Sequence, residues 1–223
     1  MRSRLVLTGL LLTTLLVGCD EGPTESIPAG ALVANGPAGF TVDDDVTGRI
    51  HEDELAPLTG LPPAELADAL KQLGFRDARV RVWTHGTAFA RILAIRLAGA
   101  REAGLMVTTQ ISQMRATPAA VVFPVPGIPA ATGYTFTGKA RRGEDTLFCQ
   151  GVWFPVQSVA VEVDTCSPDR PAATDTAVAL AHQQYARLAG DGSQRAIGPQ
   201  KATATSAASA STALPRRVIP PPV

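Results

Sequence analysis

Apolar positions recur with two different periods along the middle of the chain, and these periods predict its secondary structure. Three leucines recur at helical spacing in residues 61–75, with prolines before the run and a glycine near its end. Residues 78–98 read as two apolar or alternating strands joined by a turn at His85 and Gly86. We therefore expect a short helix followed by a β-hairpin.

The same kinds of pattern recur further along the chain. Residues 99–116 place apolar side chains on one helical face, and residues 119–143 read as two strands broken by a proline-rich corner. Residues 145–156 and 157–166 form a second hairpin, and residues 171–190 form another helix. Hairpin connections favour an antiparallel sheet packed by helices. We expect one α+β domain made of two ββα-like units after a short helix.

The start of the chain reads as an export signal. Two arginines precede an apolar run, residues 5–17, which is too short to span a bilayer comfortably. The following "LVGC" resembles the bacterial lipobox, in which a peptidase cuts before a cysteine that carries a diacylglycerol. The alternative is an ordinary secretory signal that ends in a chance cysteine. We expect a signal peptide over residues 1–18 and a lipid anchor on Cys19, on the outer face of a bacterial cell membrane.

Composition separates the expected domain from its flanks. Residues 19–39 are rich in Gly, Pro, Ala and Ser and are expected to form a flexible linker. Residues 190–223 hold few large apolar side chains, so we expect a disordered tail, with a wall-spanning or glycosylated tail as the alternative. The domain is then residues 40–189. The chain has 20 basic and 20 acidic residues, so it lacks the excess of positive charge that is typical of nucleic-acid-binding proteins.

Two cysteines remain if Cys19 is lipidated, and an even pair in an oxidising compartment indicates a disulfide. If the turn of the second hairpin centres on Gln157 and Ser158, Cys149 lies directly opposite Cys166 on the neighbouring strand. Neither cysteine has a nearby histidine or lysine in the sequence that would activate a thiol. A structural disulfide is therefore expected, and a reactive thiol is the alternative.

Residues 43–54, "DDDVTGRIHEDE", resemble the calcium-binding loop of EF-hand proteins. A calcium ion takes six to eight oxygen ligands, which such a loop wraps around it by turning at a central glycine. The matching ligands are Asp43, Asp45, Thr47, the carbonyl of Arg49, and Glu54. The entering helix is missing, because Gly and Pro precede the loop. Calcium and a solvated acidic turn that leads into a short helix both remain open.

Sequence signatures of catalysis do not occur in the chain. It has no G-x-S-x-G, no H-E-x-x-H and no phosphate-binding glycine loop, and its three histidines fall in unrelated places. We therefore expect a protein that is not an enzyme. Trp83 and Trp153 hold comparable places on the two hairpins, where they either line a ligand groove or pack in the core.

Three segments resemble known cell-envelope proteins. Residues 73–83, "LGFRDARVRVW", and residues 123–134, "FPVPGIPAATGY", together with the lipobox, resemble a group of uncharacterised actinobacterial lipoproteins. Residues 148–166, "FCQGVWFPVQSVAVEVDTC", followed by a helix, are similar to sensor-type ectodomains of actinobacterial receptor kinases. These resemblances imply a binding or sensing role in the envelope and carry over no site residues.

Three functions follow, and each requires a different feature of the structure. A membrane-anchored lipoprotein that binds an envelope ligand or protein partner requires a concave apolar groove near the tryptophans. A calcium-stabilised structural module requires carboxylates that converge on one point. A hydrolase requires a buried titratable pair in a cleft.

Overall fold

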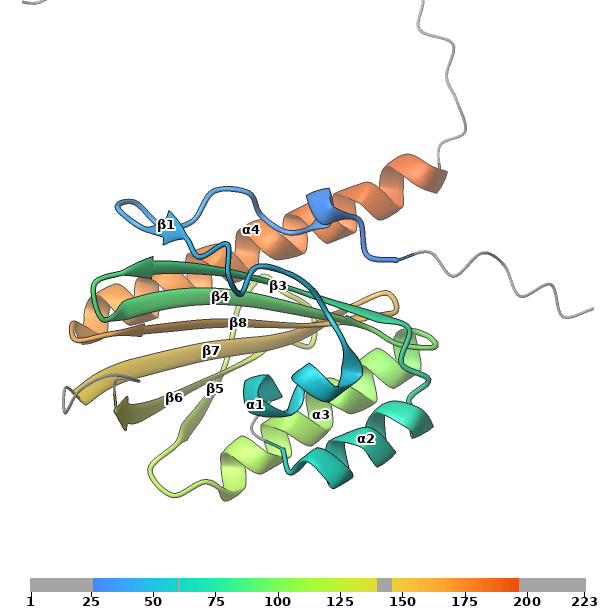
Figure 1. Cartoon of the computed structure of the whole chain (residues 1–223), viewed down its shortest axis with the longest axis horizontal. Coiled ribbons are helices and arrows are strands. Elements are labelled where there is room, and N and C mark those ends of the chain that lie inside the picture. The colour runs from blue at the N-terminus through green and yellow to red at the C-terminus, as the bar shows by residue number, and fades with distance from the viewer. Residues whose placement is uncertain (1–25, 60, 140–145, 197–223) are drawn as a thin grey trace, which may run out of the picture.

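A computed structural model describes residues 26–59, 61–139 and 146–196. They form an antiparallel sheet with helices on both faces (Figure 1), so the predicted α+β fold is confirmed. The strand order is β1-β3-β4-β8-β7-β6-β5, and β2 also pairs with β3. The strands are β1 (Thr41–Val42), β2 (Gly48–Ile50), β3 (Asp77–His85), β4 (Ala88–Arg96), β5 (Val121–Pro124), β6 (Thr132–Lys139), β7 (Thr146–Val156) and β8 (Val159–Ser167).

The helices divide between the two faces of the sheet. α4 packs on one face, and α1, α2 and α3 pack on the other (Figure 1), so the sheet separates two hydrophobic layers. The two predicted ββα units are present as β3-β4-α3 and β7-β8-α4, and they join where β4 pairs with β8. The helices are η1 (Ala29–Ala31), η2 (Glu52–Glu54), α1 (Ala56–Thr59), α2 (Pro63–Gln72), α3 (Ala100–Ala116) and α4 (Arg170–Ala196).

The glycine that follows α2 ends this helix, as the sequence predicts. Gly74 has φ +63°, a left-handed conformation that other residues adopt at a cost. The N–H of Phe75 donates to the carbonyl of Leu70 at 2.9 Å, and the N–H of Gly74 donates to that of Lys71 at 3.3 Å. This pair of hydrogen bonds is the Schellman motif, which turns the chain directly into β3.

The prediction of a flexible linker over residues 19–39 is wrong for the part that the structure describes. Ile27, Leu32 and Val33 are buried in the layer beneath α4. The N–H of Val33 donates to Oε1 of Gln184 at 2.9 Å, and Nε2 of Gln184 donates to the carbonyl of Ala31 at 2.9 Å. The segment lacks a periodic pattern because side chains, and not a neighbouring strand, satisfy its backbone.

The predicted boundary at residue 190 is also wrong, because α4 continues to Ala196. The predicted signal peptide, Cys19 and residues 197–223 of the predicted tail lie outside the described residues. Within the described ranges, no helix has both the length and the apolar character needed to cross a membrane.

Candidate functional site

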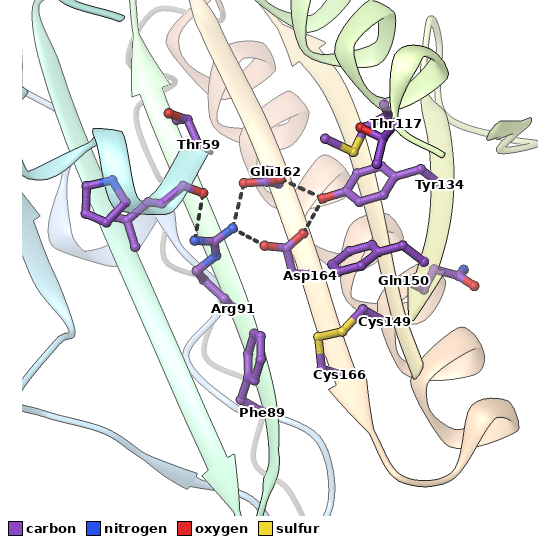
Figure 2. A pocket seen from close by; sticks show the side chains of 14 residues that line it. Thr59, Phe89, Arg91, Thr117, Tyr134, Cys149, Gln150, Glu162, Asp164 and Cys166 are labelled. Carbon is purple, nitrogen blue, oxygen red and sulfur yellow. Dashed lines mark hydrogen bonds and ion pairs between the residues drawn. A yellow bond between two sulfur atoms is a disulfide. The ribbon is translucent and has the colours of Figure 1, made fainter. Parts of the chain in front are cut away.

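A cavity of about 320 Å³ opens on the face of the sheet that α3 covers (Figure 2). Strands β4, β6, β7 and β8 form its floor, and α1 and the C-terminal end of α3 contribute to its walls. The walls are mainly apolar and include Leu58, Phe89, Met114 and Phe136. Four charged or hydroxyl-bearing side chains lie together on the floor: Arg91, Tyr134, Glu162 and Asp164. Gln150 on β7 also lines the cavity, and its Nε2 donates to the carbonyl of Thr174.

Strand register brings the polar side chains of the floor into one row. Arg91 on β4 is opposite Asp164 on β8, Asp164 is opposite Gly151 on β7, and Gly151 is opposite Tyr134 on β6. A Cβ atom added to Gly151 would stand 2.2 Å from Cζ and from the hydroxyl oxygen of Tyr134. The glycine therefore leaves the space through which Tyr134 crosses β7 and reaches the carboxylates on β8.

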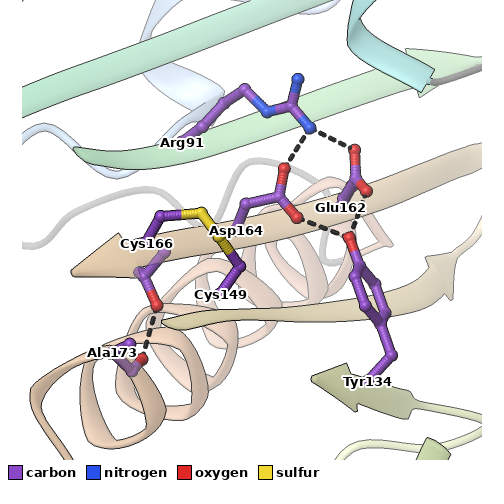
Figure 3. Close-up of a disulfide and its surroundings, with 8 residues drawn as sticks. Arg91, Tyr134, Cys149, Glu162, Asp164, Cys166 and Ala173 are labelled. Carbon is purple, nitrogen blue, oxygen red and sulfur yellow. Dashed lines mark hydrogen bonds and ion pairs between the residues drawn. A yellow bond between two sulfur atoms is a disulfide. The ribbon is translucent and has the colours of Figure 1, made fainter. Parts of the chain in front are cut away.

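The four polar side chains close a ring of contacts, which we call the Arg91 ring (Figure 3). The hydroxyl of Tyr134 lies 2.7 Å from Oε1 of Glu162 and 2.7 Å from Oδ1 of Asp164. Nη2 of Arg91 donates to Oε2 of Glu162 at 2.8 Å and also to Oδ2 of Asp164. Nη1 of Arg91 donates to the carbonyl of Leu58 at 3.0 Å, which ties α1 to the ring.

Two short contacts of one hydroxyl group, together with the raised pKa of Glu162, indicate the charge of the Arg91 ring. A tyrosine hydroxyl has one proton and donates to one carboxyl group, so its second short contact requires a proton on a carboxyl oxygen. Burial, reinforced by Asp164 and opposed by Arg91, raises the pKa of Glu162 to about 8. The hydroxyl of Tyr134 lies between the two carboxyl groups, and at neutral pH this pair of carboxyl groups holds one proton, because the pKa of Glu162 is raised. The positive charge of Arg91 and the single negative charge of the two carboxyl groups then balance.

Burial and the ring itself hold the other protons in place. Burial, together with the carboxyl groups of Asp164 and Glu162, raises the pKa of Tyr134 well above its ordinary value. Burial works against the charge of Arg91, but the same two carboxyl groups raise the pKa of its guanidinium overall. Tyr134 and Arg91 therefore keep their protons across the physiological range.

The predicted disulfide joins Cys149 to Cys166, and its sulfur atoms lie beside the Arg91 ring (Figure 3). The two residues are directly opposed on β7 and β8, and their Cα atoms are 4.1 Å apart. The connecting turn falls on Gln157 and Ser158, as expected from the sequence. The prediction is confirmed, and both cysteines also line the cavity.

The predicted calcium ligands begin in a turn at the edge of the sheet. Residues 44–46 form this turn, and the N–H of Thr47 donates to the carbonyl of Asp43 at 3.1 Å. The Thr47 hydroxyl lies near β3, where it accepts the N–H of Val82 at 3.1 Å. Asp45 is exposed to solvent. Thr47 is therefore engaged with the sheet.

The remaining predicted calcium ligands also have other partners. The predicted ligand at Arg49 is a backbone carbonyl within β2, where Arg49 is opposite Arg79 of β3, and the Arg49 side chain donates from Nε to Oδ1 of Asp77 at 2.7 Å. The carboxylate of Glu54 accepts the N–H of His51 at 2.8 Å, at the start of η2. Among the described residues, no three His, Cys, Asp or Glu side chains form a group that could hold a metal ion. In the described residues these groups do not converge, and their arrangement matches the solvated-turn alternative.

The two tryptophans lie on opposite faces of the sheet. Trp83 is 1% exposed in the layer beneath α4, and Trp153 is 0% exposed in the layer beneath α3. A Cβ atom at Gly36 would stand 2.4 Å from Trp83, so the N-terminal segment lies directly against this indole. The two side chains do not line a common groove, and both pack in the core.

Sequence reasoning missed the Arg91 ring, although the sequence carries two signals for it. Arg91 interrupts an apolar run in β4, and Glu162 and Asp164 share one face of β8 with Cys166. A strand covered on both faces offers its charged groups little water, so they must be paired. Tyr134 gives no comparable signal in the sequence, because its contact with the two carboxyl groups depends on the order of strands in the sheet.

Comparisons with known proteins show a weak structural likeness. No family model matches the chain, and no curated protein matches it significantly. A solved structure, the extracellular domain of PknH from Mycobacterium tuberculosis, is similar with a TM-score of 0.42 and 12% sequence identity. The similarity covers 70% of this chain and 82% of that chain. At this TM-score it carries no functional argument.

Proposed function

We propose that this chain is an exported, membrane-anchored binding protein that takes up a small ligand in the cavity beside the Arg91 ring. The observation that carries the proposal is the cavity itself, which combines apolar walls with a small set of buried polar groups on its floor. Ligand sites are typically concave and mostly apolar, with a few placed polar groups. The volume of about 320 Å³ suits a small molecule.

The proposed location rests on the sequence and on the disulfide. The charged and apolar pattern that ends at Cys19 supports export and lipid attachment. The disulfide between Cys149 and Cys166 fits an oxidising compartment outside the cytoplasm. A lipid on Cys19 is expected to move the protein into the membrane fraction, and a Cys19→Ala variant should lose both the lipid and this location.

The absence of catalysis is part of the same proposal. Glu162 and Asp164 are the kind of buried titratable pair that a hydrolase requires. However, Tyr134 contacts one oxygen of each carboxyl group, and Arg91 contacts the other oxygen of each. A general acid or base must come within hydrogen-bond reach of its substrate, and here each of the four oxygens already has a partner within the ring. The ring therefore favours binding over hydrolysis.

Thermal-shift measurements on the full chain test the binding function. A panel of small aromatic and aliphatic molecules should contain members that raise the melting temperature. Met114→Trp, which places a bulky side chain in the cavity wall, should abolish the rise. Leu105→Trp adds the same side chain on the exposed face of α3 and serves as the matched control. If no molecule stabilises the protein, or if the rise persists in Met114→Trp, the cavity is not the binding site.

A further inference from the structure

The Arg91 ring defines the chemical class of ligand that suits the cavity. We infer that the cavity selects uncharged, largely apolar small molecules over ions of the same shape, an inference that rests on the binding function proposed above. Three features of the described residues support it: the charge balance of the floor, the internal use of the floor's polar atoms, and the aromatic and sulfur-rich wall.

The floor has no net charge to offer a charged ligand. One guanidinium balances one carboxylate, because burial raises the pKa of Glu162 and keeps one proton on the two carboxyl groups beside the hydroxyl of Tyr134. An ion that entered the cavity would lose its water without gaining an unpaired opposite charge, which is costly. An uncharged molecule does not incur this cost.

Apart from Nε of Arg91, which is buried without a partner among the described residues, the hydrogen-bonding atoms of the Arg91 ring are engaged with one another or with α1. A ligand ammonium group could pair with an additional carboxylate only if Glu162 first lost the proton that lies between it and Tyr134. A ligand carboxylate would have to displace Asp164 from Arg91, and it would leave Asp164 buried without its partner. Breaking a buried ion pair by removing one partner is strongly unfavourable. Both kinds of ion are therefore disfavoured by the same closed ring.

The wall around the ring offers apolar surface. Phe89 is opposite Cys166 and Phe136 is opposite Cys149, so an aromatic ring lies on each side of the disulfide. The rings of Tyr134 and Phe136 are stacked, with centroids 6.1 Å apart and an interplanar angle of 17°. Phe136 is 36% exposed, which leaves part of its ring available to a ligand. An apolar ligand would bury this surface, a favourable change.

Three molecules of nearly the same shape test the inference: cyclohexylmethanol, the cyclohexylmethylammonium ion and the cyclohexanecarboxylate ion. Dissociation constants are measured at pH 7 by ligand-observed NMR on the full chain, with Met114→Trp to confirm the site. The alcohol is expected to bind at least about tenfold more tightly than either ion, a difference of about 1.4 kcal/mol. Tighter binding of either ion would overturn the selectivity but leave the binding function standing. If none of the three binds, both proposals fail.

Variants that break a contact of the Arg91 ring separate the ring's contribution to ligand selectivity from the contribution of the apolar wall. Tyr134→Phe removes the hydroxyl that joins Glu162 to Asp164, so the ammonium ion should gain affinity relative to the alcohol. Tyr185→Phe is the matched control, because Tyr185 lies on α4 and packs against Phe154 on the other face of the sheet. An unchanged preference in Tyr134→Phe would show that the ring does not set selectivity.

A second variant gives the opposite shift and guards against misfolding of the first. The double variant Asp164→Asn and Glu162→Gln keeps the shapes of both side chains but leaves Arg91 without a counter-charge, because neither amide can ionise. The carboxylate ion should then gain affinity relative to the alcohol. Glu162→Gln keeps the floor neutral and retains a hydrogen-bond donor toward Tyr134, so the preference for the alcohol should persist. Equal preferences in the double variant and in Glu162→Gln alone would contradict the charge-balance argument.

Discussion

The two faces of the sheet each bury polar side chains but use them differently. On the α4 face, Gln184 is 0% exposed and its amide binds the backbone of Ala31 and Val33. On the α3 face, the Arg91 ring binds mainly to itself and lines a cavity. Burial of a polar group is therefore a poor guide to its role. What the group contacts, and whether space remains beside it, separates a structural clamp from a candidate site.

The N-terminal segment fills part of the α4 face. No neighbouring strand among the described residues pairs with its backbone there, and side chains make those hydrogen bonds instead. The N–H of Ile27 donates to Oδ2 of Asp77 at 2.7 Å, and Nη1 of Arg81 donates to the carbonyl of Val33 at 3.0 Å. Nε of Arg187 donates to the carbonyl of Gly30 at 2.5 Å. Buried backbone groups need such partners. The segment thereby covers part of this face as an additional layer.

The α3 face is open beside the ring partly because of where α3 ends. Thr117 follows the helix in an extended conformation, with ψ 121°, because Pro118 disfavours helical geometry in the residue before it. Thr117 and Met114 therefore stand at the wall of the cavity. The last turn of α3 borders the space without filling it.

The pH dependence of stability should give the largest difference between the faces. The pKa of Glu162 is about 8 in the folded protein, against an ordinary value of 4.5. The folded state therefore binds more protons than the unfolded state between these two values. The contribution of Glu162 to the free energy of unfolding should be complete below pH 4.5 and be lost as the pH rises through about 8. The loss is on the order of a few kcal/mol.

Urea melts across this pH range measure the effect and identify its source. Glu162→Gln should flatten the decline, because an amide does not titrate, and the variant should exceed the wild type in stability at high pH. Glu65→Gln, at an exposed position on α2, is the control and should keep the wild-type slope. A slope that is the same in wild type and Glu162→Gln would contradict a protonated Glu162 in the ring.

Loss of the disulfide on the α3 face should have the next largest effect. Cys149 and Cys166 are 17 positions apart, and closing a loop of this size contributes about 3 kcal/mol by the chain-entropy estimate. Reductant, or the double variant Cys149→Ala and Cys166→Ala, should lower the free energy of unfolding by about this amount. Thermal melts with and without reductant, made on a Cys19→Ser background, provide the measurement. An identical melt in both conditions would rule out the bond in solution.

Removing the clamp on the α4 face should cost somewhat less. Gln184→Ala leaves the N–H of Val33 and the carbonyl of Ala31 without this partner, at about 1 kcal/mol or more for each group. Urea unfolding should show a loss of about 2 kcal/mol. Gln183→Ala, at an exposed position of the same helix, should change stability by less than about 0.5 kcal/mol. Similar losses in the two variants would mean that Gln184 does not hold the segment.

The contrast between the faces also shows which features the sequence determines locally. The hairpins and helices follow from periodicity within short windows, and the disulfide follows from the register of one hairpin. The Arg91 ring depends on β4 pairing with β8, and residues 91 and 164 are far apart in the chain. The N-terminal segment was missed for a similar reason, because Gln184, its partner, lies on the last helix. Long-range partners leave little trace in local patterns.

The smallest effect is expected where the chain passes along the sheet edge, at residues 43–54. Calcium at about 1 mM, the range of weak extracellular sites, should leave the melting temperature unchanged. The carboxylate of Glu54 is engaged by the N–H of His51, and the other acidic residues do not join it in a metal-binding group. Glu54→Ala should therefore lower stability slightly, by about 0.5 to 1 kcal/mol, and equally with and without calcium. A calcium-induced rise in melting temperature that Asp43→Ala and Glu54→Ala abolish would show instead that the segment rearranges around the ion. Its contacts with β3 would then have to be weaker than the ion's attraction for the gathered carboxylates.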